Sequence, residues 1–180
     1  LLRLSDDSPG KNAPLLAKGL RVDQRVIDYL LGSDEIDPQL LPFVRVVHPL
    51  FTKEVVLEAD VKERLSQLAQ AHREKGLILF FQGSYGVGKR TMAAMLCREL
   101  GTRLLAVDLP RMLEGDLSFE TALRLSFREA LLQNAALYWD HFDVLLDEDK
   151  GALRHILARG LETHPRLTFL AGERGWEPVG

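Results

Sequence analysis

The sequence has a single cysteine and no excess of positive charge. Cys97 is the one cysteine among 180 residues, so no internal disulfide can form. It lies among apolar residues at helical spacing, which predicts a buried, reduced thiol of a cytoplasmic protein rather than a nucleophile. With 23 Lys and Arg residues against 26 Asp and Glu residues, the formal net charge is -3. This balance does not favour nucleic-acid binding.

Long hydrophobic runs and sequence repeats are also missing. The longest strongly apolar run, Leu77 to Phe81, is far shorter than the roughly 20 residues that a membrane-spanning helix needs. No charged-then-apolar signal segment opens the chain. We therefore expect a soluble, cytoplasmic protein without a membrane partner. Because 46% of the residues are hydrophobic and 27% are charged, the chain can bury one sizeable core.

What the sequence does contain is an alternation of apolar strands and amphipathic helices. After a helix at about 61–75, strands are predicted at 77–82, 104–109, 135–139 and 167–171. Helices that begin near residues 89, 119 and 153 separate these strands. Such alternation predicts an α/β fold with a parallel sheet, right-handed crossovers and helices on both faces. The continuous apolar run 77–82 predicts a strand that is buried on both faces.

The first part of the chain has a weaker pattern. A short helix is predicted at 22–31, and Asp37-Pro38 and Leu41-Pro42 then interrupt the chain. We interpret residues 1–57 as an N-terminal helical segment or linker and residues 58–180 as the core domain. The chain opens without methionine, and it stops where an α/β sheet would ordinarily continue. We therefore expect it to be part of a longer polypeptide.

A phosphate-binding motif lies between the first predicted strand of the core and the helix that follows. The pattern G-x-x-x-x-G-K falls at Gly83, Gly88 and Lys89. Glycines let backbone N–H groups approach a phosphate, the helix N-terminus adds a favourable dipole, and the lysine adds a point charge. The predicted nucleotide-binding residues are Gly83, Ser84, Tyr85, Gly86, Val87, Gly88, Lys89, Arg90 and Thr91.

One position of this motif departs from the usual chemistry. The residue after the lysine is ordinarily Ser or Thr, whose hydroxyl binds Mg²⁺, and here it is Arg90. Thr91 does not take over this role, because it points about 100° further round the helix. The sequence therefore predicts that Mg²⁺ is weakly held or absent.

A second motif, Leu137-Tyr138-Trp139-Asp140-His141-Phe142-Asp143, resembles the AAA+ ATPases. The family has an apolar strand followed by Asp-Glu and then by an apolar residue and Asp. The resemblance implies that Asp140 is the Walker B aspartate, which holds the metal. His141 falls where the family has the glutamate that activates the attacking water. An alternative register places the acidic pair at Asp147-Glu148, after an apolar run at 144–146.

A third segment, 167–174, is similar to the sensor 1 strand of the same family. Glu173 aligns with a catalytic-site position that is most often Asn in the family. A carboxylate that faces the γ-phosphate would repel it unless Arg174 or Arg90 neutralised the charge. The predicted catalytic residues are Asp140, His141 and Glu173.

The resemblance covers about residues 60–178 and implies a P-loop NTPase fold with three α/β/α layers and strand order 5-1-4-3-2. It also implies ATP or ADP as ligand, and a homo-oligomeric ring in which a neighbour supplies an arginine. The fifth strand, that arginine and the helical lid would lie beyond residue 180.

Arg90, His141 and Glu173 depart from the family at three catalytic positions. They favour a domain that binds nucleotide, hydrolyses it weakly or not at all, and serves a structural or regulatory role in a ring or beside a tandem AAA+ copy. A competent motor that acts on a protein substrate and a P-loop kinase for small molecules are the alternatives.

Overall fold

The computed structural model describes residues 2–4, 20–47, 59–72 and 76–176, and the chain divides into two compact units, 1–37 and 38–180. In the first unit, strand β1 (Leu2–Leu4) pairs antiparallel with β2 (Leu20–Val22). Helix α1 (Gln24–Leu30) follows, and the Asp23 side chain caps it by accepting the N–H of Arg25 at 3.1 Å. The helix predicted at 22–31 is therefore present.

The second unit is built on a five-stranded sheet with the order β3-β5-β6-β7-β4. All neighbouring strands are parallel except β3 and β5, which are antiparallel. Counted from β4, the parallel strands have the order 1-4-3-2, which is the predicted order without its fifth strand. The strands are β3 (Val44–Val47), β4 (Leu77–Gln82), β5 (Arg103–Asp108), β6 (Ala135–Asp140) and β7 (Leu167–Gly172).

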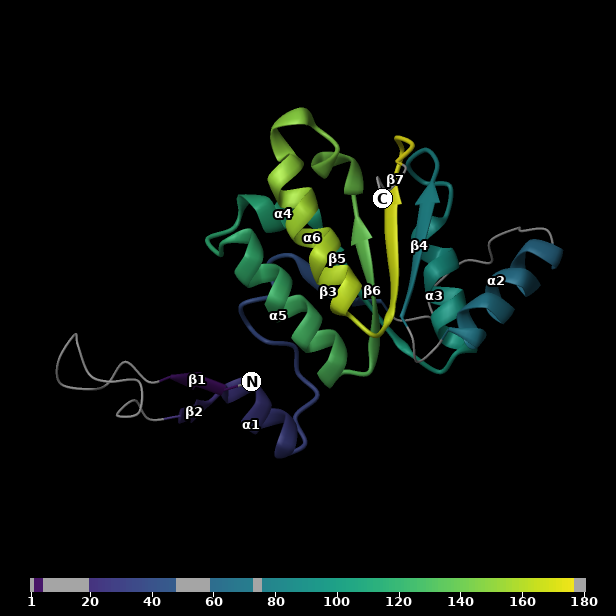
Figure 1. Cartoon of the computed structure of the whole chain (residues 1–180). Coiled ribbons are helices and arrows are strands. Elements are labelled where there is room, and N and C mark those ends of the chain that lie inside the picture. Colours follow the sequence, from purple (N-terminus) through teal and green to yellow (C-terminus); the bar gives the residue numbers. More distant parts are fainter. Residues whose placement is uncertain (1, 5–19, 48–58, 73–75, 177–180) are drawn as a thin grey trace. The chain divides into compact units, whose positions relative to one another are not determined.

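Helices cover both faces of this sheet, so the predicted α/β/α fold class is confirmed (Figure 1). One layer holds α2 (Ala59–Ala71) and α3 (Lys89–Glu99). The opposite layer holds α5 (Phe119–Leu132) and α6 (Gly151–Thr163), and the short α4 (Leu109–Glu114) joins β5 to α5. The last residues of the helix predicted at 61–75 lie outside the described residues. Among the described helices, none has the length and apolarity that a membrane span requires.

The core follows from the alternation of side chains along the buried strands. Tyr138 packs in the cluster formed with α2 and α3, whereas the next residue, Trp139, contacts Phe127 of α5 edge-on at 5.7 Å between ring centroids. Cys97 of α3 is completely buried, and its burial raises the thiol pKa to about 12. The prediction that Cys97 is buried is confirmed.

Two features of the sheet differ from the expectation. Sequence analysis predicted no strand near residue 45, yet β3 pairs with β5 along its whole length. The strand β4 was predicted to be buried on both faces, but its residues are at most partly buried and Ile78 is 46% exposed. The reason is that β4 lies at the edge of the sheet formed by the described residues.

Candidate functional site

The predicted phosphate-binding motif forms the loop between β4 and α3, and we call residues 83–89 the phosphate cradle. Gly86 and Gly88 adopt the left-handed region, with φ of +85° and +94°. Other residues rarely adopt this conformation, which explains the glycines. No neighbouring atom lies within 4 Å of a Cβ built on Gly86, so a side chain would have room there. Glycine is needed at this position for its backbone conformation. The side chain of Tyr85 at the tip of the loop is 82% exposed.

Lys89 is the first residue of α3, and its side chain folds back over the cradle. Its ammonium group donates to the carbonyl oxygens of Gly83 and, at 3.0 Å, of Ser84. These contacts hold the positive charge directly above the loop, where the backbone N–H groups of a helix N-terminus also favour anions. The phosphate oxygens of a ligand can replace the two carbonyls as acceptors.

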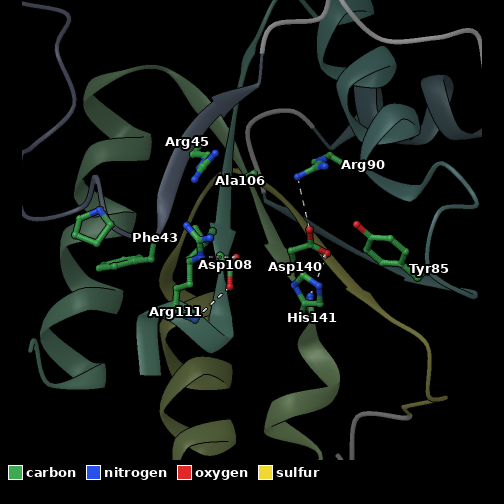
Figure 2. A pocket seen from close by; sticks show the side chains of 11 residues that line it. Phe43, Arg45, Tyr85, Arg90, Ala106, Asp108, Arg111, Asp140 and His141 are labelled. Carbon is green, nitrogen blue, oxygen red and sulfur yellow. Dashed lines mark hydrogen bonds and ion pairs between the residues drawn. The ribbon is translucent and has the colours of Figure 1, made fainter. Parts of the chain in front are cut away.

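The end of β6 brings the second motif next to the cradle. Strand β6 ends at Asp140, whereas Val144 and Leu145 belong to a 3-10 helix, η3 (Phe142–Leu145). The structure therefore supports the register that ends at Asp140 and not the alternative at Asp147-Glu148. Oδ2 of Asp140 lies 3.8 Å from a guanidinium nitrogen of Arg90. A dashed line marks this ion pair in Figure 2.

The arrangement of Arg90 and Asp140 bears on the predicted metal. The guanidinium group stands beside the one carboxylate that sequence analysis assigned to Mg²⁺. No hydrogen bond found in the structure links the hydroxyl of Thr91 to Asp140. Within residues 2–4, 20–47, 59–72 and 76–176, no three His, Cys, Asp or Glu side chains are grouped to hold a metal ion. In nucleotide sites Mg²⁺ is usually held by one or two carboxylates together with the substrate phosphates, so the guanidinium beside Asp140, and not the number of carboxylates, is the feature that disfavours a tightly held Mg²⁺.

His141, which sequence analysis predicted to be catalytic, has a backbone conformation that few residues other than glycine adopt. Its φ of +58° and ψ of +42° place it in the left-handed region, which costs most residues about 1 kcal/mol or more. Its backbone N–H donates to Oδ1 of Asp140 at 3.1 Å, and its Nδ1 lies 3.8 Å from the same oxygen. The imidazole is thus held beside Asp140 and is 47% exposed.

The third motif follows β7, where Asp143 organises the chain. Its carboxylate accepts the backbone N–H groups of Glu173 at 2.8 Å and of Arg174 at 2.7 Å. A Cβ on Gly172 would lie 2.9 Å from Oδ1 of Asp143, so only glycine permits this approach. Arg174 pairs with Asp147 at 2.8 Å and not with Glu173. Sequence analysis included Asp143 in the second motif but assigned it no role.

A cavity of 320 Å³ joins the three motifs. Its lining includes Lys89 from the cradle, Asp140 and His141 from the end of β6, and Glu173 from the end of β7. The structure therefore brings residues from all three predicted motifs to one end of the parallel sheet. In open α/β sheets this end, outside the carboxyl ends of the strands, is where ligands bind.

Comparisons of sequence give limited information. A sequence model of the variant winged helix domain matches residues 1–44, which is less than half of the chain. This match overlaps the predicted N-terminal segment, and the boundary after residue 57 stays a prediction. A search of curated proteins finds no significant match.

Comparisons of structure reveal several similar folds. A katanin structure from work on its self-assembly has a TM-score of 0.54 and 18% identity, over 80% of this chain and 55% of the katanin chain. The FIGL-1 AAA domain in complex with ADP has a TM-score of 0.54 and 17% identity, over 86% of this chain and 56% of the FIGL-1 chain. Hsp104 of S. cerevisiae in complex with casein has a TM-score of 0.55 and 15% identity, over 75% of this chain and 26% of the Hsp104 chain.

These neighbours are AAA+ ATPase domains, and the likeness establishes a shared fold. The present chain spans about half of the katanin and FIGL-1 chains and about a quarter of the Hsp104 chain.

Proposed function

We propose that the core domain binds ATP or ADP at the phosphate cradle and hydrolyses it weakly or not at all. Gly83 to Lys89, with Arg90 and Thr91, would hold the nucleotide phosphates. The domain would then serve a structural or regulatory role in a ring, or beside a second AAA+ copy, in an assembly that acts on a protein substrate.

One observation carries the proposal of binding. The ammonium group of Lys89 stands over a glycine-rich loop between a parallel strand and a helix N-terminus. This is the arrangement in which backbone N–H groups, the helix dipole and a lysine act together on phosphate oxygens. Asp140, His141 and Glu173 line the cavity that adjoins the cradle.

The charges around Asp140 support the proposal of weak hydrolysis. Catalysis of phosphoryl transfer depends on positioning and on neutralising the charge that develops, usually with Mg²⁺. Here Arg90 lies beside Asp140, and His141 stands where the resemblance requires a glutamate. We propose that Arg90 supplies a fixed positive charge to the β- and γ-phosphates in place of a tightly held metal.

Replacing Lys89 with alanine tests nucleotide binding. We expect Lys89→Ala to weaken ATP and ADP binding by at least about tenfold, because one charge-assisted contact contributes roughly 1.5–3 kcal/mol. Isothermal titration calorimetry of the 180-residue chain measures both affinities. Lys150→Ala is a matched control, since Lys150 pairs with Asp149 outside the cavity. Equal affinities for the wild type and Lys89→Ala would overturn the proposal.

Substitutions of His141 test hydrolysis. We expect the wild-type chain to hydrolyse ATP near the background rate, and His141→Glu to raise that rate or leave it unchanged. His141→Asn is the matched control, because asparagine tolerates the left-handed backbone but cannot act as a base. Steady-state phosphate release measures all three proteins. Measurable wild-type turnover that disappears in His141→Asn would identify His141 as a working base and refute the proposal.

A further inference from the structure

A second pocket lies on the β5 side of Asp140, and we call it the arginine pocket. It has a volume of 240 Å³. Figure 2 shows the side chains of Arg45, Arg90 and Arg111 around a common space, with the carboxylates of Asp108 and Asp140 beside it. The three arginines come from three different elements, β3, α3 and α4.

The pairing of β3 with β5 places Arg45 at this pocket. Arg45 lies directly opposite Ala106 in the register, and opposite residues of an antiparallel pair project from the same face of the sheet. The small side chain of Ala106 leaves room for the long arginine side chain. The backbone N–H of Asp108 donates to the carbonyl oxygen of Phe43 at 2.9 Å, which fixes the start of β3 against the end of β5.

Asp108 positions Arg111 at the opposite wall. Its Oδ1 accepts the backbone N–H of Arg111 at 3.1 Å and thereby caps α4. Its Oδ2 lies 3.6 Å from Nε of Arg111. Since Nε is the atom that faces Asp108, the two terminal NH₂ groups of the guanidinium can reach a ligand.

The charges in the pocket are not balanced. Three guanidinium groups face two carboxylates, and the ion pairs of Arg90 and Arg111 are long, at 3.8 Å and 3.6 Å. Among the described residues, Arg45 forms no ion pair with any carboxylate. A small anion can therefore add hydrogen bonds to guanidinium groups that line one pocket. Arg90 and Arg111 are more than half exposed, so their guanidinium groups can turn their N–H donors toward an anion in the pocket.

The geometry also limits the kind of anion. Guanidinium groups that approach from several sides match a tetrahedral oxyanion, whereas a planar carboxylate accepts mainly within one plane. A volume of 240 Å³ is smaller than the roughly 300–1,000 Å³ of pockets for drug-sized ligands.

We propose that the arginine pocket binds a small tetrahedral oxyanion, either inorganic phosphate or the phosphate group of a small monoester. The pocket shares Arg90 with the proposed nucleotide site, whereas Arg45 and Arg111 lie outside the phosphate cradle, so substitutions of these two arginines test the pocket separately from nucleotide binding.

Titration with inorganic phosphate tests the site. Arg45→Gln and Arg111→Gln are each expected to weaken phosphate binding by about tenfold or more, because each removes a charge-assisted contact. Arg98→Gln, which removes an exposed arginine of α3 outside the pocket, is the matched control and is expected to bind like the wild type. Calorimetry or ³¹P NMR of the 180-residue chain measures the affinities. Equal affinities for all four proteins would overturn the proposal.

Further titrations, with other variants and other anions, distinguish this site from the phosphate cradle and identify the source of the anion. Binding that survives Lys89→Ala but is lost in Arg45→Gln belongs to the arginine pocket, whereas binding lost only in Lys89→Ala overturns the proposal. If O-phosphoserine binds more tightly than inorganic phosphate, a monoester is the ligand. The opposite order indicates free phosphate. Acetate that binds as tightly as phosphate would overturn the argument for a tetrahedral ligand.

Discussion

Replacing Arg90 with serine is expected to make ATP binding strongly dependent on Mg²⁺. In EDTA, Arg90→Ser is expected to bind ATP about a hundredfold more weakly than the wild type, because a guanidinium group can make two charge-assisted hydrogen bonds of roughly 1.5 kcal/mol or more each. With excess Mg²⁺, the new hydroxyl can act as a metal ligand, so most of this loss is expected to be recovered. Titrations of both proteins with ATP, in EDTA and in Mg²⁺, measure the effect.

The physical reason lies in the ion pair between Arg90 and Asp140. At 3.8 Å from Oδ2 of Asp140, the guanidinium already stands beside the carboxylate that sequence analysis assigned to the metal. It is also 58% exposed, so it can rotate toward an incoming phosphate. Arg98→Ser changes the same residue type on the same helix, about two turns after Arg90, and is expected to have no effect. A wild type that loses ATP completely in EDTA, and an Arg90→Ser variant that behaves the same way, would contradict the prediction.

The parts of the fold that were predicted from sequence are those determined by residues that are close together in the chain. The strand before the phosphate cradle, the glycines at 86 and 88 and the helix that begins at Lys89 all follow from a local pattern, and the structure contains each of them. The end of β6 at Asp140 was predicted for the same reason, because a run of apolar residues stops there. Local backbone preferences and burial thus determined these elements.

The parts that were missed depend on residues far apart in the chain. The strand β3 has only four residues, and it forms by pairing with β5 about sixty residues later. Arg45 lines the same pocket as Arg111 only because of that pairing. Asp143 acts on the backbone of Glu173, thirty residues away, and neither segment alone indicates the contact. The partial exposure of β4 follows from its place at the sheet edge, which a pattern of apolar residues cannot reveal.

Acidification is expected to destabilise the chain through His164. This side chain is 7% exposed and stacks on Phe127, with ring centroids 4.6 Å apart. Its Nε2 has no hydrogen-bond partner among the described residues. Burial, together with the positive charge of Arg166, lowers the pKa of His164 from 6.5 to about 4. The folded chain therefore holds this histidine in the neutral form at pH values where the unfolded chain binds a proton.

The sign of the effect follows from this difference. Well above pH 6.5 neither state binds the proton and the stability is unaffected. As the pH falls from 6.5 to 4, the unfolded state gains protons first, so the free energy of unfolding decreases, by about 2 kcal/mol at pH 5. Phenylalanine can keep the stacking on Phe127 but cannot titrate, so His164→Phe is expected to lack this part of the pH dependence.

Urea unfolding at pH 7.5 and pH 5 measures the difference between the wild type and His164→Phe. The matched control is His155→Phe, since His155 is exposed on α6, and it is expected to keep the pH dependence of the wild type. A difference in stability between wild type and His164→Phe that is the same at both pH values would show that His164 is protonated to a similar degree in both states. In that case the unpartnered Nε2 would be hydrated in solution, and the packing against Phe127 would not exclude water from it.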